Sequence, residues 1–242
     1  QNAAEKLVAK KEEPKAILQQ APLASKILQP QTLDTADFKV SPLSTMRSTI
    51  AVNMEISHNI PVATVSDYIE IDELVELRKK LNTEDYHLTF TPILIKILAS
   101  ALKKYPLLNS HFDTTKREVK TFNSINIGFA TNTEAGLVVP TLRNVEKKSI
   151  NELNDEIKLL SQKAQNRTIQ LEELKGGTIS ITNYGSFGGV YGMPKINPPQ
   201  VAILGVGRIH KAPYVKNDMV IPAYILPVTL VFDHRVIDGA YA

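Results

Sequence analysis

The chain contains no cysteine and no tryptophan, and its charges nearly balance at a formal net charge of +3. Without cysteine it cannot form a disulfide framework, a thiolate metal site or a cysteine nucleophile, and an intracellular compartment fits this composition. No apolar run reaches the roughly 18 residues of a membrane-spanning helix, and the first residues lack the pattern of a signal peptide. The balanced charge argues against a nucleic-acid-binding protein, since such proteins concentrate Lys and Arg on one face. We therefore expect no membrane and no nucleic-acid partner.

The sequence does contain enough apolar material for one substantial core, with 43% hydrophobic residues over 242 positions. Residues 1–38 differ from the rest, because they are rich in Ala, Lys, Gln and Glu, and Pro14, Pro22 and Pro30 interrupt any helical pattern. This composition predicts a flexible linker at 1–38. The chain begins with Gln rather than Met, so we interpret it as a piece of a longer protein in which the linker tethers a preceding part.

Beyond residue 38, helical and extended patterns mix without strict alternation. This predicts one α+β domain over 39–242, built on a mixed β-sheet flanked by helices. Helical patterns occur at Ser41–Ile56, Asp72–Leu81, Thr91–Leu102 and, with a capping box, Ser149–Ala164. We expect the helix that starts at Thr91 to be buried on most of its circumference and Asp72 to cap its own helix. Strands are expected at Val62–Ile71, Thr178–Thr182, Val201–Arg208 and Tyr224–Phe232, and hairpins at His111–Phe122 and Ile125–Val139.

Of the five histidines, only His234 has a carboxylate at a short fixed spacing in an apolar context. The stretch Asp-His-Arg-Val-Ile-Asp-Gly at 233–239 follows the apolar run 223–232, so a buried strand would present His234 at its tip and a turn would return Asp238 toward it. An imidazole held in this way is a candidate general base. Two other interpretations exist: a turn-stabilising hydrogen bond between His and Asp, and a shared metal ion. No second His pair and no Cys supports a metal site, so we expect none.

A glycine-rich stretch at 176–189, Gly-Gly-Thr-Ile-Ser-Ile-Thr-Asn-Tyr-Gly-Ser-Phe-Gly-Gly, alternates hydroxyl and apolar residues before a turn. It lacks the Lys-Ser/Thr pair of a phosphate loop and the spacing of a dinucleotide fingerprint. Its hydroxyls either face solvent, or one of them donates to a developing oxyanion while the glycines let a substrate approach the backbone. We interpret the double proline and apolar run at 196–207 as scaffold.

Together these stretches resemble the catalytic domain of the dihydrolipoamide acyltransferases, the E2 components of 2-oxo acid dehydrogenase complexes. The resemblance runs from about Val40 to Ala240, and Asp-His-Arg-x-x-Asp-Gly at 233–239 is the family's most diagnostic motif. The glycine-rich stretch, Asn-Pro-Pro-Gln-x-Ala-Ile-Leu-Gly at 197–205 and Leu-Ser-x-Met-Arg at 43–47 also follow the family pattern. So does Ile-Gly-Phe-Ala at 127–130 followed by Gly-Leu-Val-Val-Pro at 136–140. Agreement at five places in the right order favours kinship over chance.

The resemblance implies a fold like that of chloramphenicol acetyltransferase, assembled as trimers that build a hollow core of 24 or 60 subunits. It implies transfer of an acyl group between a lipoyl thioester and coenzyme A, with His234 as general base. Thr182 would donate its hydroxyl to the oxyanion from a neighbouring subunit, and Asp238 would hold the loop and orient the imidazole. The linker would tether lipoyl domains and a domain that binds the E1 and E3 enzymes of the complex, which are all absent from this sequence.

Several alternatives stay open. We expect acetyl as the acyl group, as in a pyruvate dehydrogenase complex, with succinyl and branched-chain groups as alternatives. A non-catalytic core subunit and a free-standing acetyltransferase for a small alcohol or amine are the competing functions; intact His234 and Asp238 count against the first, and the linker against the second. The family continues for a further helix after Gly239, so the C-terminal end is expected to be truncated. No residue is assigned to coenzyme A binding, and the expected location is the bacterial cytoplasm, with the mitochondrial matrix as alternative.

Overall fold

The computed structural model describes residues 38–134 and 136–242. The chain divides into two units, Gln1–Pro42 and Leu43–Ala242. The linker predicted at 1–38 lies outside the described residues except for its last position, so it stays a prediction. Within the described ranges, no helix combines the length and the apolar character that a membrane crossing requires.

The helices begin at well-formed caps. In the second unit they are α1 Thr45–His58, α2 Asp72–Leu81, α3 Phe90–Lys104 and α4 Ile150–Gln165, with the 3-10 helices η1 Pro106–Leu108, η2 Val145–Lys147, η3 Leu171–Leu174 and η4 Tyr184–Phe187. The hydroxyl of Ser44 accepts from the backbone N–H of Arg47 at the start of α1. Ser149 and Glu152 form the predicted capping box of α4. These bonds satisfy backbone N–H groups that a helix start leaves free.

One mixed sheet organises the domain. The strands are β1 Val62–Glu70, β2 Ser110–Asp113, β3 Glu118–Thr121, β4 Ile127–Phe129, β5 Thr131–Thr133, β6 Gly136–Val138, β7 Thr141–Leu142, β8 Ile179–Asn183, β9 Ala202–Val206, β10 His210–Lys216 and β11 Met219–Asp233. The main sheet has the order β1-β11-β9-β8-β4-β7, with β10 paired to β11. β11 is antiparallel to β1, β9 and β10, whereas β8 is parallel to both β9 and β4. The pairs β2-β3 and β5-β6 form two small separate sheets.

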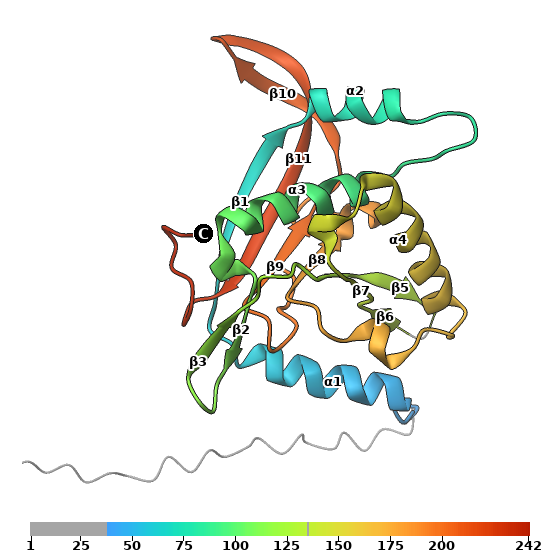
Figure 1. Cartoon of the computed structure of the whole chain (residues 1–242), viewed down its shortest axis with the longest axis vertical. Coiled ribbons are helices and arrows are strands. Elements are labelled where there is room, and N and C mark those ends of the chain that lie inside the picture. Colours follow the sequence, from blue (N-terminus) through green and yellow to red (C-terminus); the bar gives the residue numbers. More distant parts are fainter. Residues whose placement is uncertain (1–37, 135) are drawn as a thin grey trace, which may run out of the picture. The chain divides into compact units, whose positions relative to one another are not determined.

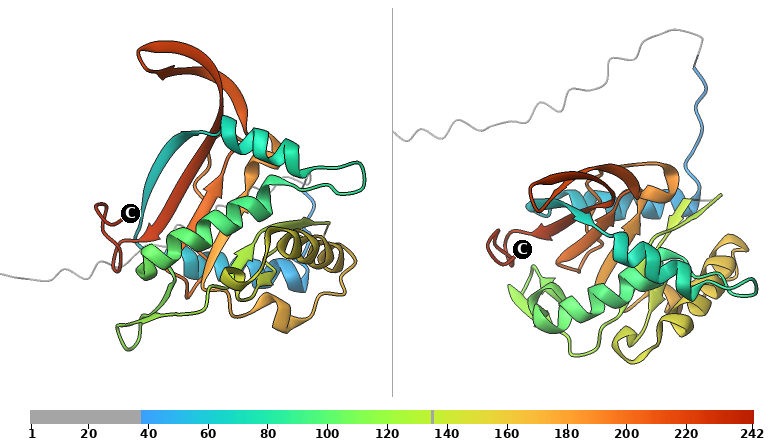
Figure 2. Two further views of the ribbon diagram at one scale, coloured as in Figure 1. Left: turned by 45° about the horizontal axis from the view of Figure 1, so that its top comes forward. Right: turned by 90° about the horizontal axis from the view of Figure 1, so that it is seen from above.

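Helices cover both faces of the main sheet: α1 lies on one face, and α3 and α4 lie on the other (Figures 1 and 2). Phe232 on β11 belongs to the larger core with α3 and α4, whereas its neighbour Val231 belongs to a smaller cluster with Ile196. Successive strand residues point to opposite faces, so one strand serves both cores. Ser57, at the end of α1, donates to the carbonyl of Ile196 at 2.6 Å and joins α1 to this second cluster.

The α+β class and the mixed sheet are confirmed, and most predicted elements appear within a few residues of their expected bounds. The hairpin of β10 and β11 was not predicted. It projects from the rest of the sheet (Figure 1) and turns at Asn217 and Asp218, which both have positive φ. Pro213 and Pro222 face each other across this pair and interrupt the apolar pattern, which is why the sequence hides it.

Three local predictions are wrong. Asp72 does not cap α2: Ile71 occupies the cap position, and the carboxylate of Asp72 accepts from the backbone N–H of Tyr224 at 2.7 Å. The segment 127–129 joins the main sheet instead of a hairpin, and only β5 and β6 pair locally. α3 is not buried on most of its circumference, since Ile97 is 52% exposed. In each case a tertiary contact outweighs the local pattern.

Candidate active site

His234 directly follows the last residue of β11 and is exposed. Its backbone N–H donates to the carbonyl of Pro61 at 2.9 Å, and the N–H of Asp233 donates to the carbonyl of Val201 at 2.8 Å. The imidazole centroid lies 5.7 Å from the ring centroid of Phe232, with a tilt of 49°. The backbone is thus held by strands on both sides while the ring stays accessible, which is the arrangement that a general base needs.

Asp238 lies beyond the turn that contains His234. Its Oδ1 accepts from the backbone N–H of Tyr241 at 2.8 Å, and its carbonyl accepts from the N–H of Ala242 at 3.0 Å. Over the described ranges no hydrogen bond joins Asp238 to the imidazole of His234, so the orienting role of Asp238 stays a prediction. No group of three or more His, Asp or Glu side chains in the described part of the chain is arranged to hold a metal ion.

The two neighbours of His234, which sequence reasoning passed over, carry the densest polar contacts of the motif. The side chain of Asp233 is 2% exposed, and its carboxylate accepts from Nε and Nη2 of Arg235 at 2.9 and 2.7 Å. The guanidinium of Arg235 lies 4.7 Å from the ring centroid of Phe112 on β2. An unpaired buried carboxylate would cost several kcal/mol, so this pairing is what allows Asp233 to lie here. The opposite charges on either side of His234 were the signal in the sequence.

Thr182 lies on β8, half-buried, at the opposite end of the sheet from His234. The strand register pairs Thr182 with Gly205, and Gly205 with Thr229 on β11. His234 lies five residues farther along β11 than Thr229. With about 3.3 Å per residue and about 4.8 Å between strands, Thr182 and His234 of one chain are roughly 19 Å apart. One chain therefore does not bring these two side chains together.

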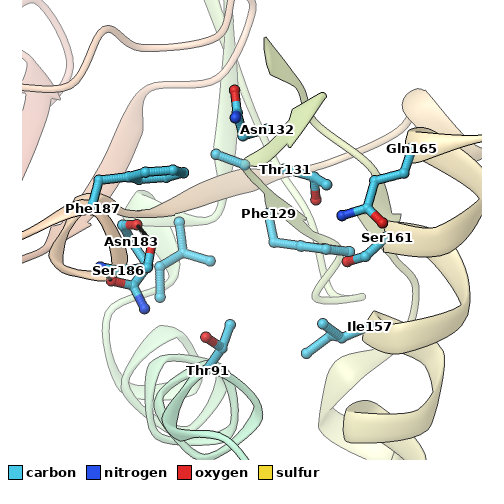
Figure 3. A pocket seen from close by; sticks show the side chains of 12 residues that line it. Thr91, Phe129, Thr131, Asn132, Ile157, Ser161, Gln165, Asn183, Ser186 and Phe187 are labelled. Carbon is cyan, nitrogen blue, oxygen red and sulfur yellow. Dashed lines mark hydrogen bonds between the residues drawn. The ribbon is translucent and has the colours of Figure 1, made fainter. Parts of the chain in front are cut away.

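A cleft opens beside Thr182, where β8 ends near α3 and α4 (Figure 3). Its lining is Thr91, Phe129, Ala130, Thr131, Asn132, Ile157, Ser161, Gln165, Ile181, Asn183, Ser186 and Phe187. Ile181 and Asn183 flank Thr182 in the sequence, and Asn183 Oδ1 accepts from the backbone N–H of Ser186 at 3.2 Å. The lining combines amides and hydroxyls with apolar surface and carries no charged side chain. Such a cleft suits an uncharged ligand that contains amide groups.

The glycines near Thr182 serve chain packing more than substrate approach. A Cβ on Gly185 would lie 2.3 Å from the backbone of Gly207, and one on Gly207 would lie 2.3 Å from the carbonyl of Val190. These positions are therefore closed by the chain itself. Gly188 differs, since its φ of 89° is one that other residues rarely adopt. The interpretation that these glycines admit a substrate is wrong for Gly185 and Gly207.

An exposed imidazole at the end of a mixed sheet, with no metal cluster in the described ranges, points to enzymes of acid–base group transfer. The chain belongs to the family described as 2-oxoacid dehydrogenases acyltransferase (catalytic domain), whose model matches residues 35–242.

Two curated relatives are the dihydrolipoyllysine-residue acetyltransferase components of the pyruvate dehydrogenase complexes of Staphylococcus epidermidis and Staphylococcus aureus. The first is 43% identical over 217 residues, which cover 87% of this chain and 50% of the relative. The second is 43% identical over 200 residues, which cover 81% of this chain and 46% of the relative. The chain thus spans about half the length of the curated relatives it matches.

Solved structures show the same fold. Azotobacter vinelandii dihydrolipoamide acetyltransferase superposes with a TM-score of 0.79 at 31% identity, covering 85% of this chain and 86% of that one. A probable dihydrolipoamide acetyltransferase from Listeria monocytogenes superposes with a TM-score of 0.81 at 34% identity, covering 86% and 90%. The cubic core of the pyruvate dehydrogenase multienzyme complex superposes with a TM-score of 0.79 at 32% identity, covering 85% and 86%.

Proposed function

We propose that the chain transfers an acyl group, acetyl first, between a lipoyl thioester and coenzyme A, with His234 as general base and Thr182 as oxyanion donor. The observation that carries this proposal is the placement of an exposed, backbone-held imidazole at one end of the sheet and a strand-borne hydroxyl at the other. A separation of roughly 19 Å within one chain means that the two act together only when copies of the chain adjoin. The site is then shared between subunits.

The Azotobacter vinelandii structure supports the choice of residues. It belongs to a study of a serine, a histidine and an asparagine in the catalytic mechanism of that acetyltransferase. In that enzyme the three residues follow one another at the same spacings as Thr182, His234 and Asp238 do here. A threonine replaces the serine and keeps the hydroxyl, and an aspartate replaces the asparagine and keeps an acceptor oxygen.

The proposed reaction begins with the thiol of coenzyme A. Free thiols have a pKa near ~8.5 and are mostly protonated at neutral pH, so an imidazole that accepts the proton raises the thiolate concentration where it is needed. The thiolate attacks the acyl thioester, and the hydroxyl of Thr182 donates to the oxyanion that forms. Collapse of this intermediate expels the dihydrolipoyl sulfur, which takes the proton back from His234. The chain has no cysteine for a covalent relay, so the transfer is direct.

Exposed apolar surface supports assembly of several copies. Exposed apolar side chains gather on α1, on the hairpin of β10 and β11, and after η4: Val52, Ile56, Val215, Val220, Phe187 and Tyr191. Apolar patches on this scale are rare on monomers and are typical of interfaces. We therefore propose a homotrimer that builds a larger core of 24 or 60 subunits. We also propose that lipoyl domains and the E1 and E3 enzymes join through segments outside this sequence, and that the assembly works in the bacterial cytoplasm.

The test is an acyl-transfer assay with the assembled protein, free coenzyme A and three donors: acetyl-, succinyl- and isobutyryl-dihydrolipoamide. We expect acyl-coenzyme A to form fastest from the acetyl donor. A preference for another donor would change the acyl group and leave the acid–base chemistry in place. No transfer from any donor by folded, assembled protein would contradict the proposal and favour a structural core subunit.

A further inference from the structure

His234 lies between two oppositely charged residues that bond to each other across it. Oδ1 of Asp233 accepts from the backbone N–H of Arg235 at 3.0 Å and from its Nε at 2.9 Å, while Oδ2 accepts from Nη2 at 2.7 Å. The N–H groups of Val236 and Ile237 both donate to the carbonyl of Asp233, at 3.0 and 2.9 Å. A two-pronged bond of this kind is specific in geometry, so the turn at His234 cannot rotate without breaking it.

This ion pair is also held by neighbouring elements. The N–H of Asp233 donates to Val201 at the entry to β9, and the guanidinium of Arg235 lies over the ring of Phe112. The N–H of Phe112 donates in turn to the carbonyl of Pro199 at 2.9 Å. Asp233 is 2% exposed and Arg235 is 34% exposed, so solvent screens the carboxylate side of the pair least. The pair is therefore a fixed part of the scaffold that surrounds His234.

We propose that Asp233 and Arg235 are positioning residues for His234: their bidentate pair, backed by Phe112, sets the direction in which the imidazole leaves β11. This inference rests on the proposed function, in which His234 is the base. It assigns to Asp233 an orienting role that sequence reasoning gave to Asp238, whose carboxylate accepts from Tyr241 instead. The pair acts through His234, and since misplacement of a catalytic group by about 1 Å can cost ~10² in rate, its effect on turnover is large.

Arg235→Lys is the direct test, because lysine keeps the charge but cannot form two parallel bonds to one carboxylate. We expect kcat to fall by about 10- to 100-fold while KM for coenzyme A and for the acyl donor stays within about twofold. The thermal midpoint and the assembly should remain those of the unsubstituted protein. Lys216→Met is the matched control, since it breaks the 3.1 Å ion pair with Glu70 between β10 and β1 and leaves kcat unchanged.

A second readout separates positioning from a general structural effect. In a His234→Ala background, adding Arg235→Lys should cause no further loss of the residual transfer, because no imidazole is left to orient. A further tenfold loss in the double variant, or an unchanged kcat in Arg235→Lys, would overturn the proposal. Unchanged turnover in His234→Ala alone would overturn the proposed function instead, so the two failures are distinguishable.

Should Arg235→Lys lower the thermal midpoint, Phe112→Leu decides, because it removes the aromatic face behind Arg235 and keeps an apolar side chain. A kcat lower by about threefold at unchanged KM supports the positioning role. An unchanged kcat overturns it.

Discussion

The two ends of the main sheet hold their functional side chains in different ways. At the end of β11, His234 lies just outside the strand, exposed, with its backbone bonded to Pro61 and its neighbours bonded to each other. At the opposite end, Thr182 lies inside β8, half-buried and in register with Gly205. The base is free at its ring and fixed at its backbone, whereas the hydroxyl is fixed by the strand ladder itself.

This difference follows from what each group has to do. A base has to reach a thiol on a substrate that arrives and leaves, so its ring benefits from exposure. An oxyanion donor is effective when it is already oriented before charge develops, and a strand provides that orientation without further rearrangement. Each end of one chain therefore carries half of a site, and in our proposal two copies together complete it.

The largest effect is expected from removing the group at the β11 end. His234→Ala should lower kcat by about 10²- to 10⁴-fold, the usual contribution of a general base, and should leave folding and assembly intact because the residue is exposed. Steady-state turnover and light scattering check both parts. His210→Ala is the control, since its Nδ1 lies against the carbonyl of Arg208 far from this end, and its turnover should be unchanged. Near-normal turnover in His234→Ala would refute the base assignment.

The next effect is at the β8 end. Thr182→Val keeps the shape of the side chain and removes the hydroxyl, so kcat should fall by about 10²- to 10³-fold with little change in KM. Thr182→Ser restores the hydroxyl and should recover most of the turnover. If KM rises and kcat does not fall, Thr182 is a binding residue, and the contrast between the two ends loses its chemical meaning.

A smaller effect is expected from Asp238→Ala, which leaves the N–H of Tyr241 without its acceptor. The free energy of unfolding should fall by about 1 kcal/mol, as for loss of one exposed or half-buried hydrogen bond, and turnover by less than about tenfold. Asp238→Asn retains an acceptor oxygen and should behave like the parent protein. Thermal unfolding and turnover both unchanged in Asp238→Ala would mean that the residue matters to neither loop nor base.

The smallest effect concerns pH and the scaffold beneath His234. Burial lowers the pKa of His111 on β2, the positive charge of Lys120 lowers it further, and the hydrogen bond to the carbonyl of Gly177 acts in the opposite direction. Above about pH 6.5 the imidazole is neutral in both folded and unfolded chains. Below that pH the unfolded chain takes up the proton first, so stability falls with pH. Unfolding midpoints of His111→Gln between pH 7 and pH 5 should fall less steeply than those of the parent, and equal slopes would contradict this.

Much of the fold could be predicted because local signals and tertiary contacts agree. The capping box of α4 and the apolar run that ends at Asp233 each specify one outcome, and the structure has both. The β10 hairpin was missed because prolines interrupt its pattern, and the burial of α3 was overestimated because Ile97 faces outward. Periodicity describes one face of an element and does not reveal what covers the other face.

The candidate site divides in the same way. His234 could be found from its carboxylate spacing, since five histidines leave few choices. Asp233 and Arg235 were overlooked, although they flank that histidine, because charge at positions i and i+2 has no standard meaning in a strand. Their pairing and the stacking on Phe112 depend on how β2 meets β9, and that arrangement is a property of the fold alone.

The most direct test of the shared site mixes two inactive proteins. Subunits with His234→Ala retain Thr182, and subunits with Thr182→Val retain His234. Co-assembled at equal amounts after dissociation, they should recover about a quarter of the parent's turnover, because that share of interfaces in a cyclic assembly joins an intact base to an intact hydroxyl. Recovery near that level would confirm that the two ends of the sheet meet between subunits, and turnover no higher than the average of the two separate variants would contradict it.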